Sequence, residues 1–345
     1  MSERRATTLV SRSFLATVVA AALAFLLLVP AARSDDAPLA WTALTPADLT
    51  KFSVAVGKQV TINLAAETDV AFAAVHIEPV QQLPRGAHFN SSDGGVAKAS
   101  FRWTPAKTGM YTIEFAASSL DLFAPNLRYV IQVKERSYTL STPAKAHWGF
   151  VLGKTVVRAQ PRQSARAVTT LATKTGEGTQ NLVLALEGRD VSSTETWYRV
   201  RLAILPNNST GWVPSTALSK LTLVTTHLYI NRSLKRATLK RLGRTIFQAR
   251  IGVGLPYWPT PRGEFYIRSK FKGFGDPFYG PVAFGTSARS AVLTDWPGGG
   301  FIGVHGTSLP QLIPGAVSHG CIRMVNSTIL TLERLMTVGT PLTVT

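Results

Sequence analysis

The stretch FIGVHGTSLPQLIPGAVSHGCIRMVN, Phe301 to Asn326, brings together two histidines, His305 and His319, and the only cysteine of the chain, Cys321. A thiol attacks a carbonyl only as the thiolate, and a nearby imidazole can take its proton and later return it to a leaving amine. The residues Ser-His-Gly before the cysteine predict a turn whose backbone N–H groups face a developing oxyanion. The stretch therefore predicts a cysteine nucleophile with its base in one site.

Zinc binding is the competing interpretation, because two histidines and a cysteine can supply three ligands. The sequence contains no CxxC pair and no pair of ligands at the spacing typical of zinc sites. We therefore expect neither a metal nor a cofactor.

The motif SHGCIR (Ser318–Arg323), with its upstream HG pair, resembles the signature of the L,D-transpeptidase (YkuD-type) catalytic domain. In that family a histidine precedes Ser/Thr-His-Gly-Cys by somewhat over a dozen residues, and here His305 precedes the serine by thirteen. The stretch TPRGEF (Thr260–Phe265) matches the family's TPxGxF strand, so the resemblance extends over about 120 residues. It implies a catalytic domain over residues 223–345, a β-sandwich or barrel with a short helix.

The resemblance also implies roles for the residues of this site. Cys321 matches the nucleophile, and His305 matches the histidine that serves as general base and acid. His319 is expected to stabilise the intermediate together with Gly320 and the Cys321 amide. The carbonyl of Gly306 is expected to orient the His305 ring.

Substrate contacts are expected from the motif and from the Gly- and aromatic-rich stretch 270–300, which in the family covers the acyl-donor site. Arg323 matches a frequent arginine of the family and either pairs with a carboxylate of the substrate or holds the loop. In the stretch 270–300, turns and core aromatics are the alternative to a lining role. The remaining candidates for substrate binding are Ser318, Tyr279, Phe284 and Trp296.

The resemblance implies a cysteine acyltransferase that acts on peptidoglycan stem peptides. Cys321 would form an acyl-thioester with a donor tetrapeptide, and an acceptor amine would close a 3-3 cross-link. With water as acceptor, the same site would be an L,D-carboxypeptidase. A wall-binding scaffold is a further alternative. Because the thiolate would meet a strained acyl donor, we also expect carbapenems to acylate Cys321.

Upstream of this domain, the sequence predicts a mainly β, multidomain protein. Residues 45–136 contain period-two runs such as Val60, Ile62 and Leu64, separated by turn residues. The LPRG, WTP and GMYT segments of this region resemble immunoglobulin or cadherin-like modules, which implies a β-sandwich that serves as spacer or binding module.

Residues 146–220 contain the segments WYRVRL and GWVPSTALS, which resemble strands of bacterial SH3-like domains and imply a small barrel. That family often binds cell-wall peptide. Trp197, Tyr198 and Trp212 are expected to pack in the core, with a ligand groove as the alternative. After the SHGCIR motif, the apolar residues Ile329, Leu332 and Leu335 recur at three-residue spacing. This spacing predicts a short helix capped by Asn326 or Ser327.

Residues 1–34 show the pattern of an export signal, with arginines before an apolar run of 16 residues and a small-x-small triplet ending at Ser34. An uncleaved N-terminal membrane anchor is the alternative. We therefore expect an exported protein of the periplasm or cell wall. A single cysteine makes no internal disulfide.

The formal net charge is +18, and without residues 1–34 the chain carries 33 Lys and Arg against 18 Asp and Glu, a net charge of +15. Residues 223–345 alone carry 14 basic against 4 acidic side chains. Such an excess attracts polyanions. For an exported protein we expect anionic cell-wall polymers, not nucleic acid, with a merely solvated basic surface as the alternative.

Overall fold

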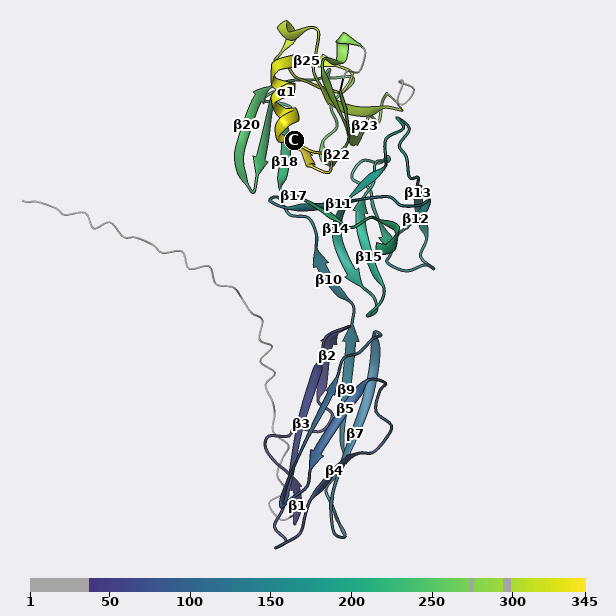
Figure 1. Cartoon of the computed structure of the whole chain (residues 1–345), viewed down its shortest axis with the longest axis vertical. Coiled ribbons are helices and arrows are strands. Elements are labelled where there is room, and N and C mark those ends of the chain that lie inside the picture. Colours follow the sequence, from purple (N-terminus) through teal and green to yellow (C-terminus); the bar gives the residue numbers. More distant parts are fainter. Residues whose placement is uncertain (1–36, 273–275, 294–298) are drawn as a thin grey trace, which may run out of the picture.

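The computed structural model describes residues 37–272, 276–293 and 299–345. Within these ranges the fold is mainly β, in three parts that follow one another along the long axis of the molecule (Figure 1). The predicted mainly β, multidomain fold is therefore confirmed. The expected signal or anchor, residues 1–34, lies outside the described residues. Among the helices of the described ranges, none is long and apolar enough to cross a membrane.

The N-terminal sandwich consists of two sheets that share one core, in which Ile62, Phe101 and Phe115 are buried. Its apolar residues alternate with exposed ones, as the period-two runs predict. One sheet contains β1 (Leu39–Trp41), β3 (Val60–Thr68), β6 (Val96–Trp103) and β5 (Ala87–Ser92) in this order. The other contains β2 (Lys51–Ala55), β9 (Leu127–Lys134), β7 (Gly109–Ser119) and β4 (His76–Pro79), with β8 (Leu122–Phe123) beside β7.

The middle sheet buries Trp197 fully, so the core interpretation is confirmed for this residue, whereas Trp212 is buried but also borders a groove with Glu187 and Arg189. Tyr198 is partly buried against the apolar cluster of this sheet, which includes Val200 and Val213. The strand order is β13 (Ala167–Leu171), β12 (Thr155–Arg158), β16 (Thr210–Pro214), β15 (Thr196–Arg201), β14 (Leu182–Asp190), β11 (Ala146–Phe150) and β17 (Thr222–Val224), with β10 (Arg136–Thr139) beside β14. The two strands β10 and β17 lie outside the range 146–220 expected for this part.

The C-terminal sheet has its own core, which includes Phe265, Phe284 and Val304. Its strand order is β20 (Arg244–Arg250), β19 (Arg236–Arg241), β18 (Thr226–Asn231), β27 (Pro341–Val344), β22 (Gly263–Lys272), β23 (Val282–Arg289), β24 (Phe301–His305), β26 (Ile322–Arg323), β21 (Gly252–Gly254) and β25 (Gly315–Ser318). Three short 3-10 helices occur in the described residues, η1 (Ser215–Ala217), η2 (Pro277–Tyr279) and η3 (Pro310–Leu312).

The predicted helix is present as α1 (Asn326–Leu335), and it buries Ile329 and Leu332 against the core of the C-terminal sheet. The predicted cap is wrong, because the helix begins after Val325 without a side-chain cap. The Asn326 side chain instead accepts a hydrogen bond from the Thr307 N–H at 2.9 Å. The Asn326 side chain, which the local sequence would assign to the cap, is thus engaged in a tertiary contact.

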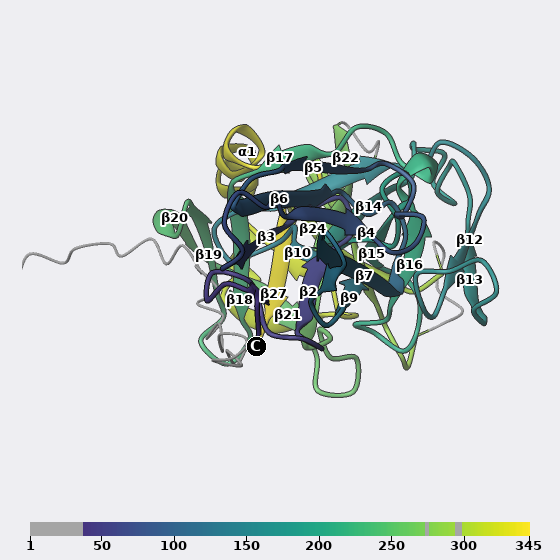
Figure 2. The same ribbon diagram turned by 90° about the horizontal axis from the view of Figure 1, so that it is seen from below.

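The middle and C-terminal sheets share a small apolar cluster, in which Trp148, Leu182 and Leu184 pack with Tyr266. The Tyr266 hydroxyl donates to the Leu182 carbonyl across this contact at 3.1 Å. Figure 2, a view along the long axis, shows β12 and β13 on the side of the molecule away from α1 and β20. The middle sheet therefore meets the C-terminal sheet along one seam, close to β22.

Candidate active site

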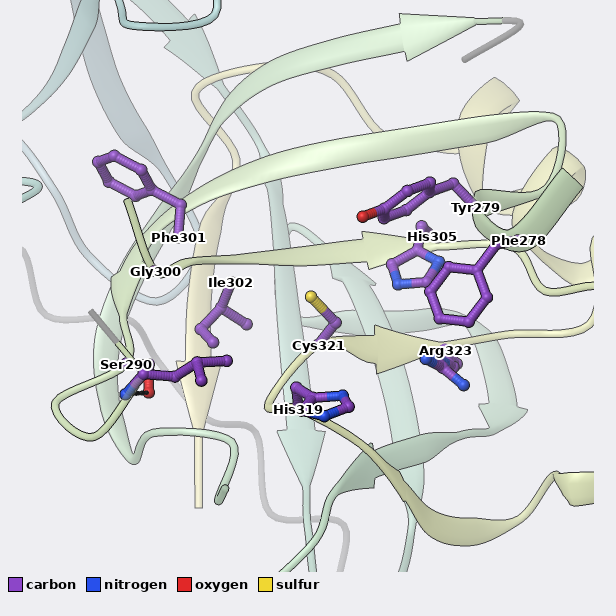
Figure 3. Close-up of a pocket in the computed structure, with 11 residues that line it drawn as sticks. Phe278, Tyr279, Ser290, Gly300, Phe301, Ile302, His305, His319, Cys321 and Arg323 are labelled. Atoms are coloured by element: carbon purple, nitrogen blue, oxygen red, sulfur yellow. Dashed lines mark hydrogen bonds between the residues drawn. The ribbon is translucent and has the colours of Figure 1, made fainter. Parts of the chain in front are cut away.

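The parallel pairing of β24 and β26 brings the SHGCIR segment next to its upstream histidine, His305. His305 at the end of β24 is paired with Arg323, and Cys321 directly precedes β26. Side chains two positions apart on a strand share one face, which puts His305 and Cys321 over the same face of the sheet. Gly303 leaves the space between them open, since a Cβ atom there would lie 3.7 Å from His305 Cδ2 and 3.8 Å from Cys321 Sγ. Figure 3 shows both side chains at this pocket.

His305 is buried and held by its neighbour. Its Nδ1 lies 2.6 Å from the carbonyl oxygen of Gly306. A carbonyl only accepts, so Nδ1 carries the proton and Nε2 is left as the acceptor. Burial lowers the pKa of His305 to about 4; the bond to Gly306 acts in the opposite direction and the Arg323 charge lowers the pKa further. The imidazole is therefore neutral at neutral pH and ready to accept a proton.

Cys321 is also kept uncharged in the resting site. Burial raises the pKa of its thiol, while the Gly303 N–H, 3.3 Å from the sulfur, and the charge of Arg323 lower it. Because burial is the larger effect, the resting pair is a neutral thiol beside a neutral imidazole. The thiolate must then form as the proton passes to the imidazole during attack.

The turn before Cys321 is held by two hydroxyl groups. Ser318 Oγ donates to the Cys321 carbonyl at 2.6 Å and accepts the Gly320 N–H at 3.2 Å. Thr260 Oγ1 donates to the Gly320 carbonyl at 2.8 Å and accepts the Gly254 N–H at 2.9 Å. The φ angle of Gly320 is +110°, which a side chain would strain.

These contacts correct two expectations. Ser318 is buried and binds the turn, and it does not line the pocket, so its assignment to substrate binding is wrong. The Gly320 N–H is engaged by the Ser318 hydroxyl, so the expectation that this amide faces an oxyanion is wrong as well. Gly320 contributes its backbone angle instead.

The rest of the pocket comes from η2, from residues 290–293 and 300–302, and from the SHGCIR segment. His319 lines it and stacks on Trp258, with ring centroids 3.8 Å apart. Tyr279 of η2 packs its ring 5.0 Å from that of His305. The pocket is lined by Phe278, Tyr279, Ser290, Leu293, Gly300, Phe301, Ile302, His305, His319, Cys321 and Arg323.

Arg323 adds a buried positive charge to this pocket. Its guanidinium lies over the Phe278 ring, 4.4 Å from the centroid, and no carboxylate pairs with it among the described residues. The Nε atom of Arg323 is buried and has no hydrogen-bond partner in the ranges that the structure describes. A buried guanidinium without a paired carboxylate is suited to bind a carboxylate of a ligand.

Two further expectations concern aromatic residues. Phe284 is fully buried in the core of the C-terminal sheet and does not line the pocket, so its assignment to the substrate site is wrong. β23 is buried on both faces, and alternation therefore gave no sign of which way Phe284 points. Trp296 lies outside the described residues.

Sequence reasoning missed several residues of the site. Phe278 and Ile302 line the pocket, Trp258 supports His319, and Thr260 holds the turn. The TPRGEF match pointed to the segment that contains Thr260, although no local pattern predicted its bond to the Gly320 carbonyl. Among the described residues, no group of three or more His, Cys, Asp and Glu side chains could hold a metal ion.

Residues 225–344 match the family model described as the L,D-transpeptidase catalytic domain, YkuD. A Bacillus subtilis (strain 168) protein that bears the name L,D-transpeptidase YkuD is 33% identical over 118 residues, which cover 34% of this chain and 65% of that protein. Its namesake in Bacillus licheniformis is 37% identical over 95 residues, which cover 28% of this chain and 50% of that protein. The chain thus spans less than two thirds of the length of either relative.

Among solved structures, the catalytic domain of an Enterococcus faecium L,D-transpeptidase, determined by NMR, is 22% identical, with a TM-score of 0.27. The match covers 35% of this chain and 96% of that one. The resemblance inferred from SHGCIR and TPRGEF is confirmed for residues 225–344. For the two preceding parts, the likeness to immunoglobulin-like and SH3-like modules stays a prediction.

Proposed function

We propose that the C-terminal sheet is the catalytic domain of a peptidoglycan L,D-transpeptidase. The observation that carries the proposal is the shared pocket of His305 and Cys321, in which Nδ1 is bound to a carbonyl and Nε2 is the proton acceptor. The match of residues 225–344 to the L,D-transpeptidase catalytic domain supports the choice of substrate.

In the first half-reaction, Cys321 Sγ attacks the carbonyl carbon of the bond between the third residue of a tetrapeptide stem and the terminal D-alanine. The thiol proton passes to His305 Nε2, and the carbonyl oxygen becomes an oxyanion. His319 and the Cys321 N–H are the groups that we assign to this oxyanion. Collapse breaks the peptide bond, the proton passes from His305 to the D-alanine amine, and a thioester remains.

In the second half-reaction, the side-chain amine on the third residue of a neighbouring stem attacks the thioester. His305 takes a proton from this amine, and the C–S bond breaks as the new amide forms. The departing sulfur recovers the proton, which restores the neutral pair and completes a 3-3 cross-link. Arg323, whose guanidinium lines the pocket without a carboxylate partner among the described residues, binds a carboxylate of the donor stem.

The test is product analysis with defined muropeptides. The purified protein, incubated with disaccharide-tetrapeptide, is expected to release D-alanine and to form a dimer joined between third-position residues. Mass spectrometry distinguishes this dimer from disaccharide-tripeptide. Tripeptide alone would identify water as the acceptor and make the protein an L,D-carboxypeptidase. Cross-linking that persists in Cys321→Ala but requires residues 50–218 would favour a wall-binding scaffold.

The pocket also makes a prediction about inhibitors. A carbapenem carries a strained acyl group and a carboxylate, so it is expected to acylate Cys321 and to place its carboxylate near Arg323. Intact-mass analysis would show one adduct on the wild-type protein and none on Cys321→Ala. Absence of an adduct on the wild-type protein would count against the site.

The setting of this activity is part of the proposal. The export pattern of residues 1–34 supports a location in the periplasm or cell wall, with the N-terminal segment as signal or anchor. The basic excess of residues 223–345 supports binding to anionic cell-wall polymers, not to nucleic acid.

A further inference from the structure

One edge of the catalytic pocket is in contact with the middle sheet. Phe301, at the start of β24, lines the pocket together with Gly300 and Ile302. Figure 3 shows the Phe301 ring directed away from Cys321. The ring borders a second cavity, whose walls come from both sheets, including Leu171, Asn181, Tyr266 and Arg268. The middle sheet therefore contacts the pocket edge from the side opposite the nucleophile.

Two guanidinium groups hold the Phe301 ring. Arg268 lies 3.9 Å and Arg289 lies 4.8 Å from the ring centroid, within the range of cation–π attraction. The Arg268 side chain is only 5% exposed and forms an ion pair with Glu177 of the middle sheet, 2.6 Å away. Arg289 also donates to the Gly299 carbonyl at 2.6 Å. The orientation of this ring thus depends on a charge supplied by the middle sheet.

Asn207 makes the second connection from the middle sheet. It lies in the connection between β15 and β16, and its amide binds both backbone groups of Arg289, the last residue of β23. Oδ1 accepts the Arg289 N–H at 3.0 Å, and Nδ2 donates to the Arg289 carbonyl at 2.7 Å. The next residue, Ser290, lines the pocket and donates its N–H to the Gly300 carbonyl at 2.8 Å. The Asn207 side chain therefore fixes the backbone of Arg289, and the pocket wall begins at the next residue, Ser290.

We propose that Asn207 is a positioning residue for the acyl-donor pocket, acting through Arg289 on Ser290 and Gly300. Glu177 supports the same wall through Arg268 and Phe301. The middle sheet thus supports one wall of the catalytic pocket, whether or not it also binds a cell-wall ligand itself. The proposal depends on the proposed function only for the identity of the donor substrate.

The neighbouring residue provides a matched control. Asn208 Oδ1 accepts the Glu264 N–H at 2.6 Å, which is also a bond between the middle and C-terminal sheets, but Glu264 does not line the pocket. The φ angle of Asn208 is +70°, so Asn208→Gly removes the side chain without backbone strain. Comparison with Asn207→Ala separates an effect on the pocket wall from a general loosening of the seam.

The first test is hydrogen–deuterium exchange of the full-length protein, which needs no substrate. In Asn207→Ala, the amides of Arg289 and Ser290 are expected to exchange about tenfold faster, because the side chain that fixes this backbone is lost. Asn208→Gly should leave both amides at the wild-type rate. Unchanged exchange in Asn207→Ala, or equal acceleration in the two variants, would overturn the proposal.

The second test separates KM from kcat with the donor tetrapeptide. Because the wall contacts parts of the donor that do not react, Asn207→Ala is expected to raise KM about fivefold and to leave kcat within about twofold. Asn207→Asp keeps the acceptor but places a carboxylate oxygen against the Arg289 carbonyl oxygen, so a rise in KM at least as large is expected. It also replaces Asn207→Ala in both tests if that variant fails to fold. A fall in kcat at constant KM, or the same change in Asn208→Gly, would contradict a positioning role. If the wild-type protein shows no turnover, the proposed function fails and the exchange test still decides the role of Asn207.

Discussion

Desolvation of Cys321 and His305, the proposed catalytic dyad, explains why a lone thiol is both reactive and protected. Desolvation raises the pKa of Cys321 and lowers that of His305 to about 4, so neither group is charged at neutral pH. Oxidants attack the thiolate far faster than the thiol. A site that forms thiolate only when a substrate carbonyl is in place would therefore survive in an oxidising compartment.

The lowered pKa of His305 predicts a pH-dependent stability. In the unfolded chain the imidazole has a pKa near 6.5 and is protonated as the pH falls, whereas in the folded protein it stays neutral to about pH 4. The folded state therefore loses stability between these values, by up to about 3 kcal/mol.

Urea unfolding of the wild-type protein and of His305→Gln from pH 7 to pH 4 measures the contribution of His305 to the pH dependence of stability. The free energy of unfolding should fall more steeply in the wild-type protein, because the variant lacks the titrating group. Parallel curves would show that the folded state does not hold His305 neutral.

At the level of secondary structure, the active site depends on two parallel strands and one turn. β24 and β26 place His305 and Cys321 over one face of the C-terminal sheet, and the turn at Gly320 aims the sulfur. The motif predicted this dyad because its residues lie close together in sequence. The contact that Asn326 makes in place of a cap was not predictable in the same way, since its partner Thr307 is 19 residues away.

Replacement of Gly320 by alanine tests the turn. Its φ angle of +110° and a contact of 2.8 Å between the new Cβ atom and Ile302 Cδ1 would both be unfavourable. We expect a loss of about 1–2 kcal/mol in stability and about a tenfold fall in kcat, because the sulfur moves relative to His305.

The matched control is Gly95→Ala, at a position with nothing within 4 Å of the new Cβ atom. Thermal unfolding and kcat of the two variants should differ clearly. Wild-type activity in Gly320→Ala would show that the turn tolerates other backbone angles.

For the molecule as a whole, the middle and C-terminal sheets pack against each other along a seam. Trp148 packs in the shared cluster so closely that a Cβ atom on Gly339 would lie 2.0 Å from its Cδ1 atom. The three-part, mainly β organisation could be predicted from alternation and turn residues. The seam could not be predicted, because no local sequence pattern around Trp148 or Asn207 indicates which residues of another sheet they contact.

Loss of the seam should affect both stability and activity. Trp148→Ala is expected to cost about 3–5 kcal/mol and to raise KM for the donor, because the pocket wall loses its support. Trp41→Ala removes an equally buried tryptophan from the N-terminal sandwich and should cost a similar amount without a change in KM. Thermal unfolding and steady-state kinetics compare the two; an equal effect on KM would argue against a role of the seam in substrate binding.

The most direct test of the dyad is the mass of the acyl-enzyme. The wild-type protein, mixed with disaccharide-tetrapeptide and quenched in acid, should carry one disaccharide-tripeptidyl group on Cys321, with release of one D-alanine. Cys321→Ala should carry none, and His305→Gln should form the adduct at least about a hundredfold more slowly, because the thiol keeps its proton. Release of D-alanine at the wild-type rate by Cys321→Ala would contradict the thioester mechanism.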